Sequence, residues 1–256
     1  MDNRHSPLPV QPLHNPGESL SERRIDILAD SIPWFILIGV TAILALIEWL
    51  RWLYNNPPNP VVFTGLALIT LSLAMIRILS LWKSHKNYYL GMQGEKYVAQ
   101  VLNADLRDRG YYTLHDIPCE RMNIDHVLIG PGGIFTIETK VARKIEGVES
   151  KIVQNIFGLF VYGYSPGWIK KALWQAKTEA NNLDQILNTE SIAHPKVIPI
   201  VFYPGWDVED DCIDEVWILN EKTLQKKIES LPAILSIEEI TLLRNNLEKY
   251  VRESDA

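Results

Sequence analysis

Two carboxylates and a lysine occur at fixed spacing around a glycine-rich turn near the middle of the chain. In "NIDHVLIGPGGIFTIETK", Asp125 lies in one mainly apolar run, and Glu138 and Lys140 lie in the next. The turn residues at 131–133, Pro-Gly-Gly, predict a β-hairpin. A loop of two or four residues places Asp125 directly opposite Glu138. Lys140 then follows on the same face, because side chains alternate along a strand.

The opposed carboxylates predict a site for a divalent cation. Two carboxylates directly opposite each other repel and weaken a sheet, unless a cation lies between them. Mg²⁺ prefers carboxylate oxygens and water, and a lysine beside the metal can orient water or stabilise charge on a phosphate. Two alternatives stay open. A three-residue loop would put Asp125 opposite Thr139, and the charges could also form a surface row in which Glu138 and Lys140 pair.

A further acid lies in a helix expected over residues 91–106. Glu95 shares one stripe of this helix with Val98 and Leu102, so it lies on the face expected to pack inward. A charge on such a face needs a partner or a metal, and Gly94 suggests a close backbone approach at the start of the helix. The alternative is a first-turn acid that the helix dipole favours.

The elements around these residues indicate an α/β domain. Strand-like runs surround the turn, and the continuous apolar run "KVIPIVFYP" predicts a central strand covered on both faces. Helical periodicity and a capping box predict helices before and after that strand. The expected strands are 111–117, 124–129, 134–141, the "KVIPIVFYP" run and "EVWILN", and a long helix is expected over 168–187, with two more helices at the end of the chain.

Two apolar segments precede this domain and predict a transmembrane helical hairpin. Residues 32–47 and 60–76 carry no charge, and each run can supply the roughly 20 residues that a bilayer crossing needs. The connector "NNPPNP" permits only a tight turn. The alternative is a buried hairpin of a soluble protein, and a role of the hairpin in transport or sensing is a further possibility.

The flanking charges predict how this hairpin is oriented. Arg23 and Arg24 precede the first span, and Lys83 and Lys86 follow the second, whereas the connector has no charge. The positive-inside rule therefore places both termini in the cytoplasm of a multi-pass cell-membrane protein. The expected organisation is a flexible polar tail over 1–31, a transmembrane hairpin over 32–82 and a cytoplasmic domain over 83–256.

Overall composition limits the other functions. The net charge of -6 argues against a protein that coats nucleic acid through a basic surface, although an enzyme with a local basic groove is still possible. The two cysteines, Cys119 and Cys212, have no zinc-like spacing. His126 alternates to the face opposite Asp125 and is interpreted as a packed strand histidine. The acidic stretch 207–215 is interpreted as a solvated loop, with a second metal site as the alternative.

Basic residues follow the hairpin in sequence. They could form a rim that binds phosphates, although charges at this density commonly only interact with solvent. The residues are Arg143, Lys144, Lys151, Lys170 and Lys171.

Four segments together resemble the nuclease-related domain (NERD) family. They are "GMQGEKYVAQVL", "IDHVLIGPGGIFTIETK", "WQAKTEANNL" and "VIPIVFYP", and the resemblance covers about residues 89–219. That family is similar to the restriction-endonuclease-like PD-(D/E)xK superfamily. The resemblance implies a restriction-endonuclease-like mixed sheet, with the hairpin at its centre and helices on its flanks.

The resemblance also implies roles for individual residues. Asp125 and Glu138 match metal ligands, Lys140 matches the catalytic lysine, and Glu95 matches a helical acid that some members use as a further ligand. Gln175 matches a glutamine of the family pattern. The chain departs from the pattern at the residues flanking the lysine, since Thr139 precedes it and Val141 follows where a small polar residue is frequent.

The sequence therefore predicts a membrane-anchored, metal-dependent nuclease. It would hydrolyse phosphodiester bonds of nucleic acid, with DNA as the first candidate, and would use Mg²⁺ or Mn²⁺. Lys140 would position the attacking water. The alternative is a membrane-tethered module that binds nucleic acid or acts as a scaffold without turnover.

Overall fold

The computed structural model divides into two compact units. One consists of residues 19–90, and the other consists of residues 91–256 together with the N-terminal residues up to Glu18. The described residues are 13–54, 59–119, 122–141, 151–155, 158–161, 166–189, 193–208, 212–213 and 215–254.

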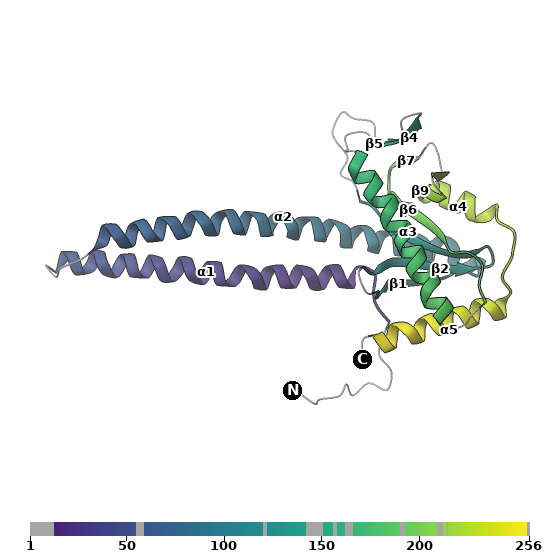
Figure 1. The fold of residues 1–256 in the computed structure, drawn as a ribbon, viewed down its shortest axis with the longest axis horizontal. Coiled ribbons are helices and arrows are strands. Elements are labelled where there is room, and N and C mark those ends of the chain that lie inside the picture. Colours follow the sequence, from purple (N-terminus) through teal and green to yellow (C-terminus); the bar gives the residue numbers. More distant parts are fainter. Residues whose placement is uncertain are drawn as a thin grey trace. The chain divides into compact units, whose positions relative to one another are not determined.

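Two long apolar helices form the first unit. Helix α1 is Glu18–Leu53 and helix α2 is Pro60–Leu106, so the last part of α2 belongs to the second unit (Figure 1). Both are long and apolar enough to cross a membrane, and most of their large apolar side chains lie on the surface. A lipid-facing hairpin requires such a surface, because lipid is itself apolar.

Polar contacts pair the two helices in an antiparallel hairpin. The hydroxyl oxygens of Thr41 and Thr70 lie 2.9 Å apart, and Trp49 Nε1 donates to Thr64 Oγ1 at 3.0 Å. Residues later in α1 therefore contact residues earlier in α2. In this respect the helical hairpin predicted from the sequence is confirmed.

The charges near the end of α1 are compensated locally. Glu48 accepts a hydrogen bond from Arg51 Nη1 at 2.7 Å and another from the backbone N–H of Asn59 at 3.0 Å. The second bond caps the start of α2, whose first N–H groups have no partner within the helix.

Both helices extend beyond their predicted limits. Residues 18–31, which the sequence analysis assigned to a flexible tail, belong to α1. Glu18 begins the helix, and its carboxylate accepts a bond from the Asn15 backbone N–H at 2.7 Å, an arrangement that the helix dipole favours. The helix expected over residues 91–106 is the end of α2, because no proline interrupts the chain between the two segments.

A mixed six-stranded sheet forms the centre of the second unit. Strands β1, β2 and β3 are antiparallel neighbours, β3–β6 and β6–β9 are parallel pairs, and the short strand β8 pairs antiparallel with β9. The predicted mixed α/β sheet with the hairpin inside it is confirmed. In sheet order the strands are β1 (Tyr112–Ile117), β2 (Ile124–Gly130), β3 (Gly133–Thr139), β6 (Ile198–Phe202), β9 (Val216–Leu219) and β8 (Cys212–Ile213).

A second, three-stranded sheet was not expected from the sequence. It consists of β5 (Gly158–Val161), β4 (Lys151–Asn155) and β7 (Asp207–Val208) in that order. Strand β7 and the edge strand β8 both lie in the stretch 207–215, which was predicted to be a loop. Their pairing with neighbouring strands corrects that prediction, and residues 209–211 and 214 lie outside the described chain.

Helices cover both faces of the large sheet (Figure 1). Helix α3 (Pro166–Thr189) and helix α5 (Ile237–Ser254) pack on one face through Leu183 and Leu247. The end of α2 and helix α4 (Glu221–Glu229) pack on the other face through Leu102 and Leu224. The apolar stripes of these helices are the reason for this arrangement, because each must be buried against the sheet.

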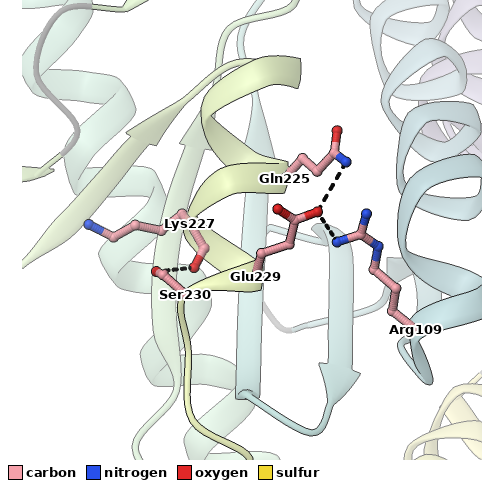
Figure 2. Close-up of polar contacts among 5 residues, drawn as sticks. All are labelled: Arg109, Gln225, Lys227, Glu229 and Ser230. Atoms are coloured by element: carbon pink, nitrogen blue, oxygen red, sulfur yellow. Dashed lines mark hydrogen bonds and ion pairs between the residues drawn. The ribbon is translucent and has the colours of Figure 1, made fainter.

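A polar contact ties the end of α2 to the end of α4. The short 3₁₀ turn η1 (Arg107–Arg109) follows α2, and Arg109 forms an ion pair with Glu229, which also accepts a bond from Gln225 at 3.2 Å (Figure 2). Glu229 therefore has a cationic partner.

The β2–β3 hairpin has a two-residue loop. Gly130 pairs with Gly133, and the register continues along both strands to the pair of His126 and Ile137. Gly133 has φ +132°, which few other residues adopt. This register is the one that places Asp125 in line with Glu138, and it excludes the three-residue loop.

Candidate metal centre

The ends of β2 and β3 bring the two predicted carboxylates together. Asp125 precedes the last residue pair of the β2–β3 ladder, and its Oδ2 accepts the backbone N–H of Thr139 at 2.8 Å. The backbone N–H of Lys140 donates to the carbonyl of Phe202 in β6 at 2.9 Å. These bonds fix the backbone on both sides of Glu138.

A third carboxylate from α3 completes the group. Asp125, Glu138 and Glu179 each offer an oxygen, and these oxygens lie within 4.8 Å of one another. Glu179 is completely buried, and no N–H or hydroxyl group in the described part of the protein donates to its oxygens. A hydrogen bond to Glu138 forms only when one of the two carboxyl groups holds a proton. A buried carboxylate without a partner is costly, so three converging carboxylates suit a hard divalent cation.

Glu179 was missed by the sequence analysis. It lies three residues after Ala176 and four before Leu183, both of which belong to the apolar stripe of α3. An acid at that position in a buried stripe was the available signal, comparable to the one that identified Glu95.

Repulsion and burial determine how these acids titrate. Burial raises the pKa of Asp125 and of Glu179 well above the ordinary value, and the neighbouring Glu138 carboxylate raises both further. A bound cation would remove this repulsion, which makes cation binding and proton release linked events.

Lys140 supplies positive charge at the centre. Its ammonium forms an ion pair with Glu138. Burial lowers the pKa of Lys140, but attraction to Glu138 and then to Asp125 outweighs burial, so its pKa is raised overall. In the cation-free protein these carboxylates favour the ammonium form of Lys140, which can donate hydrogen bonds.

Glu95 lies beside the three clustered carboxylates and is not one of them. It comes from α2, on the opposite face of the sheet from α3, and only 6% of it is exposed. Burial, followed by repulsion from Asp116 and Glu138, raises the pKa of Glu95 to about 8. The predicted further ligand is thus within electrostatic reach of the centre, and its role as a ligand stays a prediction.

The predicted close approach at Gly94 is confirmed. A Cβ atom at Gly94 would lie 1.9 Å from Val141 Cγ2, so only glycine lets α2 pass this close to the end of β3. This contact keeps the neighbouring Glu95 beside the strand ends.

Gln175 and Tyr203 lie around the centre. Gln175 is partly buried on α3, one turn before Glu179. Tyr203 follows β6 and is 1% exposed; burial and then Glu138 raise its pKa, which places it within electrostatic reach of the carboxylates. Tyr203 was not selected from the sequence, because its place in an apolar run gave no sign of this proximity.

His126 is a packed strand histidine, as predicted. It is completely buried and lies opposite His115 on β1, with their Nδ1 atoms 2.8 Å apart. Burial lowers the pKa of both rings, that of His115 to about 4. Since His126 packs with the residues under α2, it faces away from Asp125 and outside the metal centre.

The predicted phosphate-binding rim is only partly described. Lys170 and Lys171 are exposed on α3. Arg143 and Lys144 lie outside the described residues, and so does the side chain of Lys151.

Comparison with known proteins identifies the segment that holds this centre. Residues 90–204 match the model of the family described as the nuclease-related domain, NERD. An uncharacterized protein of Bacillus anthracis is 32% identical over 77 residues, which are 28% of this chain and 36% of that protein. The chain thus matches about a third of that relative's length. No solved structure matches the chain.

The family match confirms the resemblance inferred from the sequence. It covers all five residues selected there as site residues and also includes the unexpected acid of α3. The residues are Glu95, Asp125, Glu138, Lys140, Gln175 and Glu179.

Proposed function

We propose that this chain, whose residues 90–204 form a nuclease-related domain, is a membrane-anchored hydrolase that cleaves phosphodiester bonds of nucleic acid with a divalent cation. Mg²⁺ or Mn²⁺ is the proposed cation, and DNA is the first candidate substrate. The observation that carries the proposal is the completely buried carboxylate of Glu179, to which no donor group among the described residues donates and which lies within reach of Asp125 and Glu138.

The three carboxylates would hold the cation. When bound, it would neutralise charge on the phosphate and make a water molecule more acidic. Asp125 is well suited to this task, because its bond to Thr139 orients one carboxylate oxygen and leaves the other free to act as a ligand.

Lys140 would stabilise the transition state. Its ammonium pairs with Glu138, so it can donate hydrogen bonds to the attacking water or to a phosphate oxygen. A preorganised positive charge acts where negative charge develops. Water then adds across the P–O bond, which leaves one phosphate end and one hydroxyl end.

The two apolar helices would anchor the domain in a membrane. Their exposed apolar side chains, and the aromatic residues Trp49, Trp52 and Trp82 near the predicted ends of the spans, support this proposal. Both termini would lie in the cytoplasm, where nucleic acid is present.

The test is cation binding and cleavage by the full chain in detergent micelles. Wild type should bind Mg²⁺ or Mn²⁺ by calorimetry and cleave labelled DNA or RNA. Asp125→Asn should lose most cation affinity and cleavage and still fold, because its amide oxygen can accept the bond from Thr139. Glu253→Gln, on the exposed side of α5, is the matched control. A wild-type chain that binds neither cation would overturn the proposal.

A further inference from the structure

The outer face of α3 carries lysines and a tryptophan without an acid. Lys170, Lys171, Trp174 and Lys177 are all exposed, and Trp174 is 61% exposed. From the start of α3 to Leu183, the only acid in the sequence is Glu179, which is buried. This face is therefore basic, although the chain as a whole has a net charge of -6.

Two ion pairs elsewhere in the domain contrast with this face. Glu229 on α4 receives both Arg109 and Gln225 (Figure 2). On α5, Arg244 pairs with Glu248 at 2.7 Å. Lys170, Lys171 and Lys177 form no ion pair with any residue that the structure describes, and Lys177 lies within electrostatic reach of Glu215. The α3 lysines thus have charge available for an anionic ligand.

One row of α3 residues leads from this face to the metal centre. Lys171, Gln175 and Glu179 follow one another at single-turn spacing, and they are exposed, partly buried and completely buried in that order. Trp168 packs against Tyr203 with ring centroids 5.7 Å apart, which fixes the start of the helix over the sheet. This row places the basic face and the carboxylate of Glu179 on the same helix, two turns apart along the row.

We infer that this face of α3 binds an unpaired strand of nucleic acid beside the metal centre. Lys170 and Lys171 contact its phosphates, and Trp174 stacks on a base. A base inside a duplex hides both faces in the stack, whereas an unpaired base offers one to an aromatic ring, so an exposed tryptophan among lysines fits a single strand. The inference rests on the proposed function and adds the substrate class.

An anionic membrane surface would also attract lysines and a tryptophan. The row from Lys171 to Glu179 favours nucleic acid, because it links the basic face to carboxylates that suit a cation and a phosphodiester. A lipid headgroup at the membrane surface would give no role to the buried carboxylate of Glu179. The membrane surface therefore becomes an outcome of the test.

The test measures binding of fluorescent oligonucleotides to the full chain in lipid nanodiscs, with EDTA present so that nothing is cleaved. Trp174→Ala should weaken single-strand affinity by roughly 5- to 150-fold, the usual effect of losing one stacked base. Trp174→Phe should stay within about threefold of wild type, because a phenyl ring still stacks. Affinity for a blunt duplex should not change in either variant.

The lysines are tested through salt dependence. The double variant Lys170→Gln/Lys171→Gln should reduce the slope of log affinity against log salt by about 1.4, since each single-strand phosphate contact contributes about 0.7. The matched control is Lys222→Gln/Lys226→Gln on α4, which removes the same charge from exposed positions and should leave the slope unchanged.

A crosslinking experiment identifies what binds the α3 face. A comparison of cleavage with single-strand binding separates this inference from the proposed function. A photo-reactive benzoylphenylalanine in place of Trp174 should crosslink to the oligonucleotide, and crosslinking to lipid alone would overturn the inference. If wild type cleaves nucleic acid with Mg²⁺ or Mn²⁺ but Trp174→Ala binds single strands as tightly as wild type, only this inference fails. If single-strand binding depends on Trp174 but no cleavage occurs with either cation, only the hydrolase proposal fails.

Discussion

The carboxylates of Glu138 and Glu179 face each other between a strand and a helix that are distant in sequence. One oxygen from each residue and one from Asp125 lie within 4.8 Å of one another. After burial, the charge of Glu138 is the largest cause of the raised pKa of Glu179. Helix α3 thus brings a third carboxyl group onto the β2–β3 hairpin, where one lysine, Lys140, already pairs with Glu138. Ionising all three buried carboxyl groups is unfavourable for the cation-free fold, and a bound cation would offset that cost.

Neutralising Glu179 should therefore stabilise the cation-free protein. Glu179→Gln keeps the shape of the side chain and removes a carboxyl group whose charged form is disfavoured by burial and by Glu138. The gain in stability is expected at alkaline pH, where wild-type Glu179 loses its proton. The variant's melting temperature in EDTA should rise by roughly 2–4 °C for each kcal/mol of relieved repulsion. The increase that Mg²⁺ gives wild type should largely disappear, because only a ligand of the folded state stabilises it.

Thermal melts of the full chain in detergent, with and without Mg²⁺, measure both effects. Glu253→Gln is the control for loss of a surface charge. A Glu179→Gln chain that melts earlier in EDTA and still responds fully to Mg²⁺ would show that Glu179 has a structural role instead.

The stability of the cation-free protein should depend on pH through Glu95. Its pKa is about 8 in the folded protein, whereas the ordinary value is 4.5, so the folded state holds more protons between these pH values. Stability is therefore highest at the acidic end of this window and falls as pH rises toward 8. Asp125 and Glu179, whose pKa values are also raised, act in the same direction.

Melts in EDTA between pH 6.5 and 8 isolate this effect. Burial lowers the pKa of His115 to about 4, so its opposite contribution is confined to pH values below about 6.5. Glu95→Gln should reduce the decline in melting temperature between these two pH values. Equal declines in the variant and wild type would contradict the assignment of Glu95.

The local part of the site could be predicted from the sequence, because short-range rules fix it. Strand alternation and turn chemistry favoured the register that aligns Asp125 with Glu138, and the strand pairing and the bond from Thr139 to Asp125 confirm it. Glu179 reaches the site because one particular turn of α3 packs over β3. That packing is tertiary, and sequence periodicity does not predict which turn makes the contact. The same limit applies to Glu95, whose helix lies on the other face of the sheet.

The orientation of the hairpin is a separate prediction. Positive charges at Arg23, Arg24, Lys83 and Lys86 flank the two apolar segments, and the connector has none. A reporter fused after Trp82 should therefore be active only as a cytoplasmic reporter, because short positively charged flanks are retained on that side. Export of the reporter would place the nuclease-related domain outside the cell and would remove its access to cytoplasmic nucleic acid.

Substitution of Lys140 should separate the rate of cleavage from the affinity for nucleic acid. Its ammonium is paired with Glu138 beside the other carboxylates, so it is placed to act on the transition state. Lys140→Ala should lower single-turnover cleavage by about 10²-fold or more, the typical loss for one preorganised charge-stabilising group. Affinity for nucleic acid and for Mg²⁺ should change much less, because lysine is not a metal ligand and a catalytic group acts mainly in the transition state.

Lys140→Arg provides the conservative comparison. The planar guanidinium is bulkier than an ammonium and cannot occupy the same place beside Glu138, so cleavage should not be restored. Cleavage and binding are measured for wild type and both variants at one salt concentration, and Lys249→Gln on α5 is the control for loss of a lysine charge. If Lys140→Ala cleaves as fast as wild type, the lysine has no role in the chemistry, and stabilisation of the transition state must come from the carboxylate-held cation or from other residues around it.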